Sequence, residues 1–202
     1  MIRVSVTDLE QYRYYCDSED MELETLLSRL RRSEEKSPEM LRGIAFHEVL
    51  ENLGPCEIDV IEHGGFRFRF DMEGELSLPK IRELKAEKEY QVNGETVVLV
   101  GKVDAMKGFE VHDHKLTKTI DAENYTDSLQ WRCYLDMFGA KKFIYNVFQG
   151  YEDRTGDIVI KDFQTFPFFD YPEMKRDIST ALNGFIKFAK THLPERFCEQ
   201  TI

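Results

Sequence analysis

The chain has 202 residues, of which 42% are hydrophobic and 32% are charged, and its formal net charge is −11. This length and composition are typical of a folded protein with a sizeable core, so we expect residues 1–202 to form a single domain. No apolar run reaches 18 residues and the chain does not begin like a signal peptide, which argues against a membrane protein and predicts a cytoplasmic location.

The first predicted element is a helix over residues 5–31, where apolar residues recur at helical spacing and Ser5 or Thr7 can serve as the N-cap. A polar stretch over 31–40 predicts a loop. Pro38 directly after a serine indicates that a second helix begins there.

The middle of the chain is predicted to be rich in strands. The second helix is expected to stop at Gly54-Pro55, and phenylalanines alternate with polar residues over 66–71, which indicates a strand or hairpin. A short helix is predicted over 79–87. Asn93-Gly94 is a strong hairpin signal, and Lys107-Gly108 predicts a further turn.

The remaining elements alternate between strands and helices. We expect a strand over 109–116, an amphipathic helix over 127–140 that ends at its glycine, strands over 142–150 and 157–168, and a closing helix over 171–193. The order α, β-meander, α, β, β, α predicts an α/β (α+β) fold with a central mixed β-sheet flanked by helices.

The predicted strand over 109–116 carries charges among apolar neighbours. Because side chains two residues apart in a strand share a face, Asp113 and Lys115 are expected on one face, with His112 and His114 on the other. The turn before this strand would bring Asp104 close to Asp113. Two neighbouring carboxylates repel each other unless a cation lies between them, and their oxygens suit Mg²⁺ or Mn²⁺.

A lysine beside such a cation can stabilise the charge that develops on a phosphate or orient the attacking water. The alternative is that Asp104 and Asp113 are ordinary turn or edge-strand acids and that Lys115 is a solvated lysine. For an isolated Asp-x-Lys triplet this alternative is favoured. The net negative charge excludes a general nucleic-acid coat protein, but an enzyme that meets nucleic acid at one cation-bearing site remains compatible with it.

Four short motifs follow one another on separate predicted elements: GIAFH at 43–47, GKVD at 101–104, DHK at 113–115 and QWRCY at 130–134. In this order the chain resembles the PD-(D/E)XK nuclease superfamily, in particular its RecB-type and phage exonuclease-like branch. The resemblance covers nearly the whole chain. It implies a restriction-endonuclease-like core.

The resemblance also implies a metal centre. Asp104 and Asp113 would bind Mg²⁺ or Mn²⁺, together with the backbone carbonyl of His114. His47 would be a further metal ligand, as in other members of this branch.

The remaining implied roles concern catalysis. Lys115 would be the catalytic lysine, and Gln130 and Tyr134, one helical turn apart, would orient it and contact the DNA backbone. Glu87 resembles an accessory acid of some relatives, with Glu89 as the alternative position.

Other cofactors and motors are not expected. Some relatives carry an iron–sulfur cluster, but here Cys16 has only Cys198 as a counterpart near the C-terminus, so no cluster is expected. The sequence also lacks the phosphate-binding loop of a helicase motor.

The resemblance therefore predicts a divalent-metal-dependent DNA nuclease in a bacterial or phage-infected cell. We expect an exonuclease on double-stranded DNA ends in phage or prophage recombination or repair, acting with a recombinase or single-strand-annealing partner, and forming a homo-oligomer that clamps DNA. The alternatives are a non-catalytic nucleic-acid-binding or scaffold protein, an endonuclease, and an RNA-directed nuclease.

Overall fold

The computed structural model of the chain describes residues 2–52, 59–72, 79 and 81–197, without the side chains at 81 and 82. Its elements, in chain order, are β1 (Ile2–Ser5), α1 (Val6–Asp17), α2 (Leu23–Leu30), α3 (Pro38–Asn52), β2 (Val60–His63), β3 (Phe66–Phe70), β4 (Ile81–Val92), β5 (Glu95–Lys107), β6 (Glu110–Thr117), α4 (Glu123–Thr126), α5 (Leu129–Phe138), β7 (Lys142–Glu152), β8 (Ile158–Phe169), α6 (Met174–His192) and a 3₁₀ turn (Pro194–Arg196).

The strands form one mixed sheet in the order β1-β5-β6-β7-β8-β3-β2, with β4 paired to β5. β4 runs antiparallel along nearly the whole length of β5, so β1 and β6 share the opposite edge of that strand. β1 with β5, β6 with β7, and β3 with β8 are parallel pairs. The expectation of a central mixed sheet flanked by helices is therefore confirmed.

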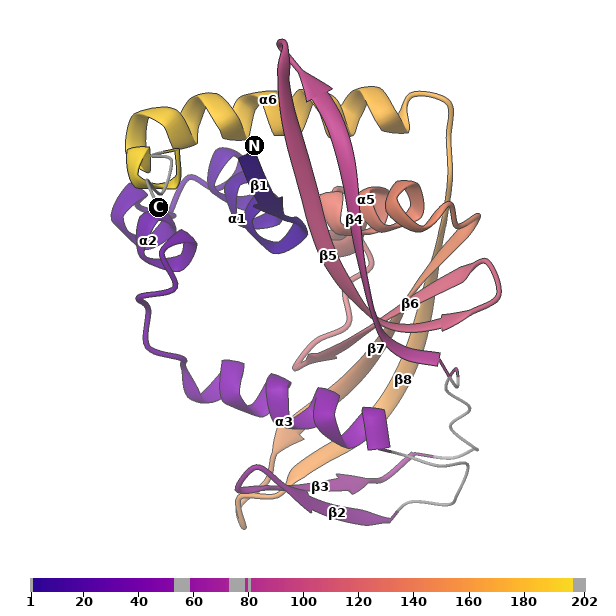
Figure 1. The fold of residues 1–202 in the computed structure, drawn as a ribbon. Helices are drawn as coiled ribbons and strands as arrows, with labels where there is room; N and C mark the ends of the chain where they lie inside the picture. Colours follow the sequence, from indigo (N-terminus) through magenta and orange to yellow (C-terminus); the bar gives the residue numbers. More distant parts are fainter. Residues whose placement is uncertain (1, 53–58, 73–78, 80, 198–202) are drawn as a thin grey trace.

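Two hydrophobic cores lie on opposite faces of this sheet, and Figure 1 shows α3 on one side of the strands and α5 and α6 on the other. Along β7, Phe143, Tyr145 and Val147 pack into one core, while Phe148 packs into the other, as the alternation of a strand requires. Helices α1, α5 and α6 cover the first face, α2 packs against α1 at the border of this core, and α3 covers the second face through residues such as Phe46. Full burial of each such aromatic side chain contributes about 1.5–3 kcal/mol of hydrophobic free energy.

Several local predictions are confirmed. Ser5 caps α1 by accepting a hydrogen bond from the backbone N–H of Asp8 at 3.0 Å, and α3 begins at Pro38. The hairpin between β4 and β5 turns at Asn93-Gly94, both with positive φ, and α5 ends at Gly139 in the left-handed conformation. The predicted helix stop at 54–55 lies outside the described residues.

The prediction of a short helix over 79–87 is wrong, because this segment belongs to strand β4. Its glutamates and lysines favour helices, but Leu84, Ala86 and Tyr90 alternate with exposed residues at a period of two. Pairing with β5 along eleven residue positions outweighs the local helix preference. The alternation was the signal in the sequence that pointed to a strand.

The N-terminal region differs from the predicted single helix over 5–31. Residues 2–5 form β1, and the helical part is divided into α1 and α2 by the segment 18–22. The short helix α4 was also not predicted. No helix in the described ranges is long and apolar enough to cross a membrane.

Candidate active site

The site lies where β5 and β6 separate. On one edge of β5, the pairing with β1 ends at Ser5 opposite Val100, and the pairing with β6 extends only to Ala105 opposite His112. Within the described residues, the segment 101–104 between them, which is the GKVD motif, therefore has no strand partner on this edge. A gap in the sheet therefore lies along this motif.

The other edge of β5 is irregular at the same level. Glu83 of β4 would lie opposite Asp104, but it has a φ of 55° and the ladder skips this pair. Such a conformation costs a non-glycine residue about 1–3 kcal/mol and is enriched at functional sites. Val103 and Met106 both pack into the core on the first face of the sheet. Side chains three positions apart lie on opposite faces of a regular strand, so the alternation of β5 is also interrupted near Asp104.

Asp104 is held between the two strands and α3. Its Oδ2 accepts a hydrogen bond of 2.7 Å from the backbone N–H of His114 and lies 3.3 Å from Nδ1 of His47. Burial disfavours the charged carboxylate, but the imidazole and the backbone donor outweigh it and lower the pKa of Asp104 to about 2. The same contact raises the pKa of His47, although burial alone would lower it.

Asp113 points toward α5, where Gln130 contacts it, and its Oδ2 forms an ion pair of 2.6 Å with Nζ of Lys115. Oδ2 is a buried oxygen, and Lys115 is the charged group that lies against it. Burial raises the pKa of Asp113 to about 6, against the opposing effect of Lys115. Burial would lower the pKa of Lys115, but Asp113 raises it, so this lysine stays charged.

Gln130 contacts Asp113, the ion-pair partner of Lys115, so the lysine is reached from Gln130 through this acid. Its Nε2 donates to Oδ1 of Asp113 at 3.0 Å, and its Oε1 accepts from the hydroxyl of Tyr145 at 3.2 Å. That hydroxyl also contacts Ser128, the N-cap of α5, at 3.0 Å. The carboxylate is therefore held by a chain of hydrogen bonds that begins at the start of the helix.

Tyr134 holds the GKVD motif and is not placed to contact DNA, because its side chain is only 3% exposed. Its hydroxyl donates to the backbone carbonyl of Lys102 at 2.8 Å. The ring packs directly against Gly101, where a Cβ atom would lie 2.6 Å from Cε1 of the tyrosine and 3.0 Å from Val6. The glycine of one motif is thus required by the tyrosine of another.

The histidines at 112 and 114 point to the α3 side of the sheet, as predicted. Asn146 of β7 lies within hydrogen-bonding distance of both rings, 3.2 Å from Nδ1 of His112 and 3.1 Å from Nδ1 of His114. The ring of His114 lies beside that of His47, with 6.4 Å between centroids. This contact links β6 to α3.

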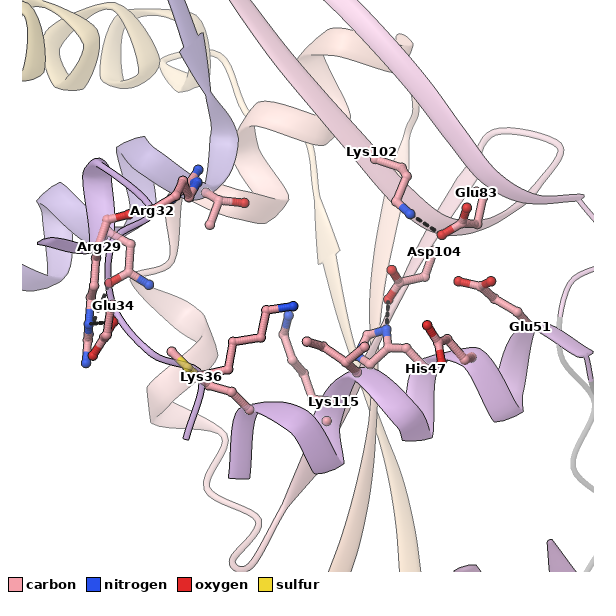
Figure 2. Close-up of a pocket in the computed structure, with 16 residues that line it drawn as sticks. Arg29, Arg32, Glu34, Lys36, His47, Glu51, Glu83, Lys102, Asp104 and Lys115 are labelled. Carbon is pink, nitrogen blue, oxygen red and sulfur yellow. Dashed lines mark hydrogen bonds and ion pairs between the residues drawn. The ribbon is translucent and has the colours of Figure 1, made fainter. Parts of the chain in front are cut away.

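An open cleft of about 960 Å³ gives access to these groups. It lies between α3, the end of α2 and strand β5, and His47, Asp104 and Lys115 all line it (Figure 2). Asp113 does not line the cleft and is buried behind Lys115, whose side chain is 34% exposed. The structure therefore brings together the charged residues predicted from the motifs, with the lysine and one acid reaching solvent.

The predicted accessory acid, Glu87, does not belong to this site. It forms an ion pair with Arg3 on the exposed face of the sheet and does not line the cleft, and neither does Glu89. The acids that line the cleft next to Asp104 are Glu51 of α3 and Glu83 of β4.

The sequence contained partial signals for the residues that were missed. Glu51 follows His47 by one helical turn, and Lys102 precedes Asp104 by two residues. Glu83 carried no such signal, because it fell within the segment predicted to be helical. It forms an ion pair with Lys102 at the mouth of the cleft (Figure 2).

Among the described residues, no cysteine lines the cleft. Cys16 is exposed and Cys133 is buried in α5, both as free thiols, while Cys56 and Cys198 lie outside the described residues. In the described parts of the chain, no three side chains of His, Cys, Asp or Glu are arranged together so as to hold a metal ion.

Comparisons with known proteins show a shared fold and no family. The chain matches no family model and no curated protein. Among solved structures, it is similar to the crystal structure of SSO0001, with a TM-score of 0.55 and 16% sequence identity over 93% of this chain and 77% of that chain. At this identity the similarity concerns the fold alone.

Proposed function

We propose that the protein is a divalent-metal-dependent DNA nuclease with the restriction-endonuclease-like core of the PD-(D/E)XK superfamily. The observation that carries this proposal is the meeting of Asp104, Asp113, Lys115 and His47 where two strands separate into an open cleft. These four residues belong to three motifs that are up to 68 positions apart in sequence (115 − 47). Their convergence needs the whole fold.

The donor atoms suit Mg²⁺ or Mn²⁺. Oδ2 of Asp113 is a buried carboxylate oxygen beside Lys115, Asp104 is a carboxylate held ionised, and His47 and the carbonyl of His114 would complete the set. Magnesium commonly uses one or two carboxylates and completes its shell with water and substrate phosphate. Such an ion therefore does not require three metal-binding side chains that are already grouped together.

The surrounding residues have separate tasks in this proposal. A bound cation would lower the pKa of a coordinated water and so supply hydroxide at neutral pH. Lys115 places a permanent positive charge in the cleft, where it would stabilise the negative charge that develops on the phosphate. Gln130 holds Oδ1 of Asp113, and the other oxygen, Oδ2, pairs with Lys115.

The preferred substrate in this proposal is the end of double-stranded DNA, in phage or prophage recombination or repair, and this part follows from the motif resemblance. The test is to incubate the purified protein with linear and circular DNA and Mg²⁺. Degradation of linear DNA alone supports an exonuclease, whereas equal cutting of both forms supports an endonuclease. Competition with RNA separates an RNA-directed nuclease.

The decisive variant is Lys115→Ala. Loss of one charge-stabilising group of this kind lowers kcat by about 100-fold to 1000-fold. Lys107→Ala is the matched control, because Lys107 is an exposed lysine in the same hairpin and does not line the cleft. Equal cleavage by the two variants, with both folded by circular dichroism, would overturn the assigned mechanism.

One observation favours a second candidate, a nucleic-acid-binding protein without catalysis. Asp113 is already neutralised by Lys115, so a cation is not needed to balance its charge. The same incubation distinguishes the two candidates: binding of DNA without cleavage at any concentration of Mg²⁺ or Mn²⁺ would support the second.

A further inference from the structure

The basic side chains of the cleft are not equivalent. Four of the five form ion pairs: Arg29 with Glu34, Arg32 with Asp8, Lys102 with Glu83 and Lys115 with Asp113. The fifth, Lys36, forms no ion pair within the residues that the structure describes, and it is exposed. Figure 2 shows its side chain extending from the segment before α3 into the cleft, in the direction of Lys115.

The cleft-facing side of α3 changes character along the helix. Met40, Gly43, Ile44, His47 and Glu51 follow one another at intervals of one to four residues and all line the cleft. Before His47 this side is apolar. After His47 it is acidic, since Glu48 and Glu51 line the cleft there together with Glu83 of β4. A phosphate chain is therefore repelled by the second half of α3, and along the first half it meets no acid of this helix that lines the cleft.

Gly43 leaves the first half of α3 open. An added Cβ atom at this position would find no heavy atom within 4 Å, and the residue lines the cleft one helical turn, about 6 Å, before His47. A glycine inside a helix costs about 1 kcal/mol relative to alanine, and nothing in the packing of the protein requires it here. Its neighbours Met40 and Ile44 are 41% and 40% exposed, so the cleft wall is uncovered.

We infer that the substrate strand leaves the reaction site along the first half of α3, over Gly43, and that Lys36 binds the next phosphate on that side. This inference rests on the proposed nuclease function and adds a direction to it. An unpaired cation in a cleft of a protein with a net charge of −11 is a defined site for a phosphate. Lys36 is a substrate-binding residue in this scheme and does not contact the reacting atoms.

The test compares Lys36→Met with Lys187→Met, an exposed lysine of α6 that does not line the cleft, so both variants have the same net charge. Loss of one charged contact raises KM for linear DNA about tenfold in Lys36→Met, with kcat unchanged. DNA affinity is measured with Ca²⁺ in place of Mg²⁺ across about 50–200 mM salt, and the slope of log K against log salt falls by about 0.7–0.9. Lys36→Arg restores both quantities.

The outcomes separate this inference from the function on which it rests. If the parent protein cleaves DNA while Lys36→Met and Lys187→Met share the parental KM and salt slope, the strand path is wrong and the nuclease function stands. If the parent protein neither binds nor cleaves nucleic acid, the proposed function falls and the strand path falls with it.

Discussion

The two sides of the candidate site are built in contrasting ways. On the α5 side, Asp113, Gln130, Tyr134 and Tyr145 are joined by hydrogen bonds and packing, and the acid is only 3% exposed. On the α3 side, His47 and its neighbours line an open cleft with charged and uncovered surface. One side therefore fixes the geometry of the buried acid, and the other is open, where the proposed function places the substrate.

The two sides also differ in how they change the pKa of the acid that each contains. Burial raises the pKa of the carboxylate on the α5 side, Asp113, to about 6, although the neighbouring Lys115 acts to lower it. The carboxylate on the α3 side, Asp104, is held by an imidazole and a backbone N–H, which lower its pKa to about 2. Two acids of one site therefore differ by about four pKa units because of their surroundings.

The largest expected effect on stability is that of Gly101→Ala on the closed side. The new methyl group would lie 2.6 Å from the ring of Tyr134, so the helix or the strand must move. Such overpacking lowers the free energy of unfolding by about 3 kcal/mol. Urea denaturation measures this change. An unchanged midpoint would mean that the packing of α5 against β5 is loose.

The next effect concerns pH and the binding of Mn²⁺. A carboxylate must lose its proton to bind a metal, so with a pKa of about 6 for Asp113, this group alone lowers the affinity for Mn²⁺ about tenfold between pH 7 and pH 5. The raised pKa of His47 acts in the same direction. Isothermal titration calorimetry between pH 5 and 7 measures the dependence. A constant affinity over this range would exclude Asp113 as a ligand.

A smaller effect is expected for Tyr134→Phe, which removes the hydroxyl that holds the carbonyl of Lys102. Loss of this buried hydrogen bond costs about 1 kcal/mol, or a decrease of about 3 °C in Tm. Cleavage is also expected to slow, because the GKVD segment lacks a strand partner on that edge. Tyr14→Phe is the control, since Tyr14 is 53% exposed. Equal behaviour of the two variants would contradict the positioning role.

The smallest effect has the opposite sign and lies on the open side. Gly43→Ala places a methyl group where no atom lies within 4 Å, so the helix gains about 0.5–1 kcal/mol of stability. Thermal unfolding measures the gain, and KM for linear DNA should rise because the wall of the cleft is no longer bare. A variant that is more stable but has the parental KM would show that the substrate does not pass over this helix.

Much of the secondary structure could be predicted from the sequence, because it depends on neighbours a few residues apart. The Asn93-Gly94 turn, the glycine that ends α5 and the proline that starts α3 were all recognised from local chemistry. The segment 79–87 was not, because its helix-forming residues gain more from pairing with a distant strand.

The sequence by itself determined which side chains share a face of each element. Asp113 and Lys115 occupy one face of β6, and Gln130 and Tyr134 one face of α5, because strands and helices have fixed periods. Only the tertiary structure decided what those faces meet. It placed Gln130 on the acid and Tyr134 on the neighbouring strand, and it brought Glu83 to the cleft in place of Glu87. The register of β4 and the point where β5 and β6 part depend on contacts between distant segments, which local spacing does not specify.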